Sequence, residues 1–133
     1  MNVVITILLT ILIFGIIIFI HEFGHFITAR MTGVKVNEFS LGMGPAILKK
    51  QGKKTLYSLR LLPIGGYCAM EGENEDSEDE NAFRSKSVPK RILICAAGAA
   101  MSIVLGVILT LVTFIGEPYY SSSTVAVFNS ENA

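Results

Sequence analysis

The sequence predicts a mainly α-helical membrane protein with two transmembrane helices and a β-strand segment between them. Of its 133 residues 51% are hydrophobic and only 17% are charged, whereas about a quarter of the residues in soluble domains are charged. The apolar residues gather in two blocks near the chain ends, and every Lys and Arg lies between Arg30 and Arg91. This pattern excludes a disordered chain, a nucleic-acid-binding protein with a basic face, and a disulfide-stapled secreted domain.

The first apolar block predicts a transmembrane helix over residues 1–29. No charge lies between Val3 and Ile20, and about 20 apolar residues suffice to cross a hydrocarbon core of about 30 Å. A cleaved signal peptide is the alternative, but it would begin with basic residues and end at a small-residue cleavage site. This chain begins with Met-Asn, and its apolar run leads directly into His-Glu-Phe-Gly-His.

The second apolar block predicts a transmembrane helix over residues 92–116, which again carry no charge. Small side chains recur in this block at every fourth position, so they share one helix face and allow another helix to approach closely. The members of this small-residue row are Gly98, Ser102, Gly106 and Thr110. Helix packing is the simplest role for the row.

The basic residues predict the orientation of the chain in the membrane. All 11 of them lie between the two apolar blocks, so the positive-inside rule places residues 30–91 in the cytosol. We then expect the N-terminus and the tail, residues 117–133, on the extracytoplasmic side.

Residues 34–70 favour two or three short β-strands that form a membrane-associated hairpin. We expect the first strand to be broken at Gly42–Pro45, a turn around Gly52, and a second strand over Thr55–Leu62 that Pro63 closes. This sheet either lies in the cytosol or dips into the membrane interface beside the first helix. Irregular backbone is tolerated at that depth only where protein or a water-filled cavity covers it.

Residues 71–80 contain seven acidic side chains and predict a flexible, solvated loop. A calcium-binding loop is excluded, because the required ligand spacing and central glycine are absent.

The sequence His21-Glu22-Phe23-Gly24-His25 is an HExxH motif on a predicted helix. Residues four apart share a helix face, so both imidazoles can reach one Zn²⁺. Glu22 lies beside them and can accept a proton from the water that attacks a carbonyl group. Ionisable groups in a membrane helix are costly and usually functional. The alternative is that the two histidines merely mark an interfacial helix end.

Four segments carry a resemblance to a known family: IIIFIHEFGHFITAR, EFSLGMGPAI, LRLLPIGGYCAM and ICAAGAAMSIVLG. Together they resemble the site-2 protease family of intramembrane zinc metalloproteases, and within it the bacterial branch typified by the regulator of sigma-E protease. The resemblance covers almost the whole chain. It implies that His21 and His25 are zinc ligands and that Glu22 is the general base.

The resemblance also implies how substrate is bound. The glycine-containing segments would form a membrane re-entrant β-loop that receives substrate as an extended strand. The implied substrate-binding residues are Gly42, Gly44, Gly65, Gly66 and Ser102. The implied substrates are single-pass membrane proteins, such as anti-sigma factors or signal-peptide remnants, cut within the lipid membrane during regulated intramembrane proteolysis.

Two departures from the family pattern stand out. The second span usually contains Ala-Gly-Pro followed by Asn, but here the sequence is Ala97-Gly98-Ala99 with Ser102 at the Asn position. In addition, the family's third zinc ligand is an Asp in an LDG motif, whereas the only aspartates of this chain, Asp76 and Asp79, lie in the acidic loop. A catalytic zinc site needs three protein ligands and a water.

Residues 125–133 look like the opening of a PDZ-like domain. We therefore expect the chain to be the N-terminal part of a longer protease and to be inactive alone. Two other hypotheses stay open at this point: a non-catalytic two-span adaptor that binds peptides through the β-loop, and a short two-span regulator in which the HExxH sequence is accidental.

Overall fold

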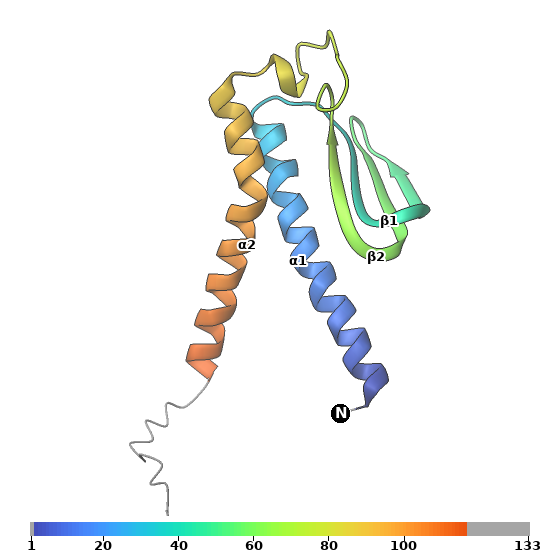
Figure 1. The fold of residues 1–133 in the computed structure, drawn as a ribbon, viewed down its shortest axis with the longest axis vertical. Helices are drawn as coiled ribbons and strands as arrows, with labels where there is room; N and C mark the ends of the chain where they lie inside the picture. The colour runs from blue at the N-terminus through green and yellow to red at the C-terminus, as the bar shows by residue number, and fades with distance from the viewer. Residues whose placement is uncertain (1, 117–133) are drawn as a thin grey trace, which may run out of the picture.

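The computed structural model describes residues 2–116, and the predicted start of a PDZ-like domain lies outside these residues. The elements follow in the order α1 (Val3–Met31), β1 (Val36–Gln51), β2 (Leu56–Met70), a short 3₁₀ helix η1 (Phe83–Ser85) and α2 (Val88–Gly116). Two long apolar helices with a β-hairpin between them fit the predicted membrane protein (Figure 1).

Both helices are long and apolar enough to cross a membrane. At 1.5 Å per residue each is about 44 Å long, which exceeds the hydrocarbon core of about 30 Å. They lie side by side at the ends joined to the loop and diverge toward the N-terminus (Figure 1). α2 begins at Val88, four residues before the predicted span, because Pro89 suits the first helical turn and Lys90 continues the helix outside the charge-free block.

β1 and β2 form a two-stranded antiparallel sheet, but each strand is longer than predicted. The expected breaks are wrong: β1 continues through Gly42–Pro45, and β2 continues past Pro63 to Met70. Gly42 adopts φ +87° and Gly65 φ +76°, left-handed conformations that let a strand bend without ending.

The bends fold the two strands into four adjacent rows. Residues 38–41 pair with residues 66–69 on one side and with residues 56–59 on the other. Residues 56–60 in turn pair with residues 46–51 on their far side. Among the described residues, the row 66–70 pairs only with β1, so one of its edges has no strand beside it. We call residues 66–70 the edge row.

The hairpin packs against α1 on the side away from α2 (Figure 1). The contact is aromatic: the ring centroids of Phe26 and Phe39 are 5.0 Å apart, those of Phe19 and Phe39 are 6.0 Å apart, and those of Phe26 and Tyr57 are 6.1 Å apart. Such pairs contribute about 1 kcal/mol each beyond the burial of their surface. Fully buried Ile94 of α2 belongs to the same core, which therefore joins both helices and the hairpin at the loop end.

The acidic run, residues 71–80, has no regular secondary structure, and two of its acids tie it to the hairpin. The Lys35 ammonium lies 3.2 Å from a carboxylate oxygen of Glu71 and 3.4 Å from one of Asp79. Two backbone hydrogen bonds hold the run to the start of the hairpin. The Lys35 N–H donates to Asn81 O, and the Glu71 N–H donates to Lys35 O. The remaining acids of the run are mostly exposed, and Asp76 forms an ion pair with Arg84, 2.8 Å away, at the surface.

Candidate metal centre

α1 presents His21, Glu22 and His25 at the point where it meets α2. As predicted from the i, i+4 spacing, the two imidazoles share one helix face, with ring centroids 5.0 Å apart. Their Nε2 atoms are 3.3 Å apart. Both side chains are half-buried.

Groups on α2 orient both imidazole rings. His25 Nδ1 lies 2.8 Å from the carbonyl oxygen of Ile94, which can only accept, so we assign the Nδ1 proton to this bond. Ser102 Oγ lies 3.2 Å from Gly98 O and donates its single proton there. It therefore accepts from His21 Nδ1, 3.1 Å away. In this assignment neither Nε2 carries a proton.

Two unprotonated Nε2 atoms facing each other at 3.3 Å lack a hydrogen between them and fit a shared cation. Zinc–nitrogen bonds of about 2.0–2.1 Å at a tetrahedral angle separate two nitrogen ligands by about 3.3 Å. A hydrogen bond from each Nδ1 to an outer group is the usual way in which proteins fix metal-binding histidines. The donor set and its spacing thus suit Zn²⁺.

The imidazoles fit beside α2 only because Gly98 has no side chain. A Cβ atom at this position would lie 2.3 Å from His25 Nε2 and 2.7 Å from His21 Nε2. Gly24 plays the matching part on α1, since its Cβ would lie 2.5 Å from Ala97 O. The sequence pattern identified Gly98 as a packing residue but not its contact with the histidines, because that contact joins positions more than seventy residues apart.

Glu22 faces a cavity of about 440 Å³ between α1 and the edge row of β2. Besides Glu22 and His25, the cavity is lined by residues 66–70 and by Glu73 and Asn74. The Glu22 carboxylate has no hydrogen-bond or ion-pair partner among residues 2–116, so it is available to a ligand in the cavity. A Cβ at Gly66 would lie 3.1 Å from Glu22 Cγ, which shows how closely β2 passes over this side chain.

The structure brings only part of the predicted substrate-binding set to this cavity. Gly66 lines it, and Ser102 contacts His21 from α2. Gly42 and Gly44 lie beside Leu62, and Gly65 lies beside Met43, so these three glycines serve the bends of the hairpin.

Cys68 also lines the cavity, but its thiol is a packing group. Burial and the negative charges of Glu22 and Glu73 raise the pKa of Cys68 to about 12. The side chain belongs to the hydrophobic core. A third metal-binding side chain is likewise missing: within residues 2–116 no group of three His, Cys, Asp or Glu residues could hold a metal ion.

Comparison with known proteins identifies the family. The family model for peptidase family M50 matches residues 9–130. A protein of Clostridium acetobutylicum named as a zinc metalloprotease is 46% identical over 111 residues, 84% of this chain and 33% of its own length. One of Fusobacterium nucleatum with a similar name is 45% identical over 108 residues, 81% of this chain and 32% of its own.

A protein of Enterococcus faecalis named as a protease is 53% identical over 72 residues, 53% of this chain and 17% of that protein. The chain thus spans at most about a third of the length of these relatives. The matches confirm the resemblance found in the sequence motifs. The chain belongs to peptidase family M50, the site-2 protease family.

Proposed function

We propose that this chain provides the HExxH half of an intramembrane zinc endopeptidase that hydrolyses peptide bonds of single-pass membrane proteins. One observation carries the proposal: groups of α2 orient the two imidazoles of α1 so that their Nε2 atoms lie 3.3 Å apart, with the unpartnered Glu22 carboxylate beside them in a cavity. A peptide-binding adaptor has no use for this arrangement.

His21 and His25 would hold the metal through their Nε2 atoms. A bound Zn²⁺ would polarise the carbonyl group of the scissile bond and make water more acidic. Glu22 would accept a proton from the attacking water and return it to the departing amine. The hydrogen bonds of both Nδ1 atoms keep the rings in place while this occurs.

The metal site needs one more protein ligand than residues 2–116 provide. In the proposed enzyme this ligand comes from outside these residues. This third ligand would approach the two Nε2 atoms from the side that neither α1 nor α2 covers.

The edge row of β2 is the proposed docking place for substrate. Residues 66–70 line the cavity beside Glu22, and one of their edges has no strand next to it. An extended peptide that adds to this edge would pass beside Glu22 with its backbone exposed. Proteolysis requires such an extended form, because the hydrogen bonds of a helix protect its amides. Anti-sigma factors or signal-peptide remnants are the proposed substrates, and regulated intramembrane proteolysis is the proposed setting.

The proposed orientation has the loop end of the molecule in the cytosol. The 11 basic residues lie between the two spans, as the positive-inside rule requires of a cytosolic loop. His21 lies about 27 Å along α1 from Val3, so if Val3 marks the outer edge of the hydrocarbon, the proposed metal lies inside it near this surface.

The decisive experiment is Glu22→Gln in the full-length protein. We expect the variant to keep its zinc and to lose cleavage of a membrane-embedded reporter, because the amide cannot accept a proton. Glu78→Gln, an exposed residue of the acidic run, is the matched control and should cleave normally. Cleavage that survives Glu22→Gln would remove the assigned base, and a protein without zinc bound through His21 and His25 would remove the metal site.

A further inference from the structure

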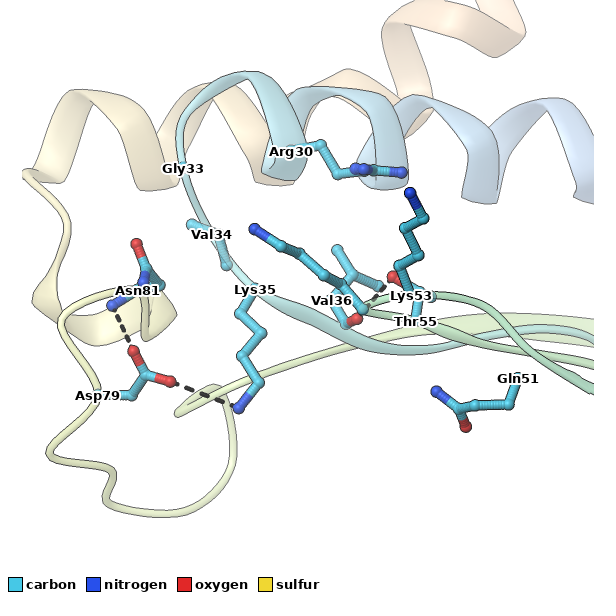
Figure 2. Close-up of a pocket in the computed structure, with 11 residues that line it drawn as sticks. Arg30, Gly33, Val34, Lys35, Val36, Gln51, Lys53, Thr55, Asp79 and Asn81 are labelled. Carbon is cyan, nitrogen blue, oxygen red and sulfur yellow. Dashed lines mark hydrogen bonds and ion pairs between the residues drawn. The ribbon is translucent and has the colours of Figure 1, made fainter.

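A second pocket lies at the loop end of α1. It has a volume of about 600 Å³ and is lined by the end of α1, the start of β1, the turn between β1 and β2, and part of the acidic run (Figure 2). None of its lining residues belongs to the cavity beside Glu22.

The pocket is strongly basic. Four cations line it, against the single acid Asp79; they are Arg30, Lys35, Lys53 and Lys54. Lys35 is neutralised by Glu71 and Asp79. The other three have no hydrogen-bond or ion-pair partner for their charged groups among residues 2–116, although the Arg30 guanidinium lies 5.5 Å from the centre of the Phe26 ring.

Two of the unpaired cations approach each other from different elements. In Figure 2 the Lys53 side chain extends from the β1–β2 turn toward the Arg30 side chain at the end of α1. Like charges that converge without an acid between them favour an anion. A planar guanidinium beside flexible ammonium groups suits the several oxygens of a phosphate.

The height of the pocket points to the source of that phosphate. With Val3 at the outer edge of a hydrocarbon core about 30 Å thick, Arg30 lies about 40 Å along α1 and so about 10 Å beyond the core on the loop side. This is at the outer surface of the headgroup layer, which the long side chain of Arg30 can reach. Basic pockets at this level are typical binding places for anionic lipids.

We propose that this pocket binds the phosphate of an anionic membrane lipid in the leaflet next to the loop. The headgroup contacts Arg30 on α1 as well as Lys53 and Lys54 on the turn between β1 and β2. It therefore links this turn to the end of α1. The hairpin is otherwise held to α1 mainly by aromatic packing, so the lipid fixes its position along the helix. The site does not depend on the proposed protease activity.

The test uses the full chain in a neutral detergent, titrated with phosphatidylglycerol or phosphatidylcholine and followed by native mass spectrometry. We expect phosphatidylglycerol to bind in preference to phosphatidylcholine. Each basic residue near an anionic surface accounts for about a fivefold change in affinity, so Arg30→Gln with Lys53→Gln should weaken phosphatidylglycerol binding about 25-fold.

Lys49→Gln with Lys50→Gln is the matched control, since it removes two charges from the same hairpin outside this pocket. An equal loss in the control would show diffuse surface attraction and overturn the site. Lys53→Gln with Lys54→Gln, confined to the turn, should also lose affinity while the circular dichroism spectrum is unchanged. The last measurement adds inorganic phosphate to the complex with phosphatidylglycerol. Displacement of the lipid by phosphate at equal concentration would overturn the lipid assignment.

Discussion

The small-residue row of α2 has two halves that look alike in sequence and differ in structure. Gly98 and Ser102, here called the contact half, meet the histidines of α1. Gly106 and Thr110, the open half, lie where the helices have diverged, and a Cβ at Gly106 would meet nothing within 4 Å. A shared spacing therefore identifies a helix face, but the crossing point of the helices decides which residues on that face are constrained.

Gly98→Ala should have the largest effect, because it disturbs the contact between the contact half and the histidines. Its methyl group would overlap His25 Nε2, so the imidazoles or the helices must move apart. We expect zinc affinity to fall by roughly 100-fold or more, the upper end of the losses that follow disturbed ligand orientation. Gly106→Ala is the matched change in the open half and should leave zinc affinity unchanged. Competition with a chelating dye measures both, and equal effects would erase the distinction.

Gly24→Ala tests the same contact from α1. The added methyl group would lie 2.5 Å from the carbonyl oxygen of Ala97, and backbone cannot yield as a side chain does. We expect the folded state to lose about 1–3 kcal/mol, the usual cost of overpacking, visible as a lower thermal midpoint. Gly15→Ala, with open space around its Cβ, should be neutral or slightly stabilising. A neutral Gly24→Ala would mean that the helices do not touch there.

Ser102→Ala sharpens the comparison at the level of one hydroxyl group. The change removes the acceptor for His21 Nδ1 without adding bulk, so zinc affinity should fall about 10-fold. Thr110→Ala is the matched control in the open half. It removes a hydroxyl that bonds only to Gly106 O, so it should leave zinc affinity unchanged. Ser102→Thr, which keeps the hydroxyl, should restore part of the loss. An unaffected Ser102→Ala would show that His21 is oriented by other groups.

The smallest expected effect is the loss of stability around Glu71 at low pH. Hydrogen bonds from Asn37, Ser77 and Lys35 lower the pKa of Glu71 to about 2, from an ordinary value near 4.5. Because the folded-state pKa is the lower one, this contribution to stability is present above about pH 4.5 and is lost as the pH falls toward 2. The protection of the amides of residues 71–81 from hydrogen exchange should fall over this range before that of α1 or α2. Glu71→Gln should weaken this pH dependence and leave the part contributed by Asp79, whose pKa is also lowered, chiefly by its hydrogen bond with the Asn81 N–H.

The sequence alone predicted the features that depend on local spacing. The HExxH motif, the two apolar spans and the turn around Gly52 all follow from the composition and period of neighbouring residues. The length of the strands did not, because Gly42, Gly44 and Pro63 are turn formers in isolation, and only pairing with a distant row keeps the chain extended through them. The roles of Gly98 and of the Ile94 carbonyl group were hidden for the same reason: they depend on where two helices cross.

The dependence of the histidines on α2 has a thermodynamic consequence. His25 is aimed by a carbonyl group of α2, so a metal ion that binds both imidazoles also binds the docked form of the helix pair in preference to the separated one. Metal loading and helix association are then linked equilibria, each strengthening the other. A chelator would act on this protein as a mild, local denaturant that loosens the crossing of the helices as well as emptying the centre.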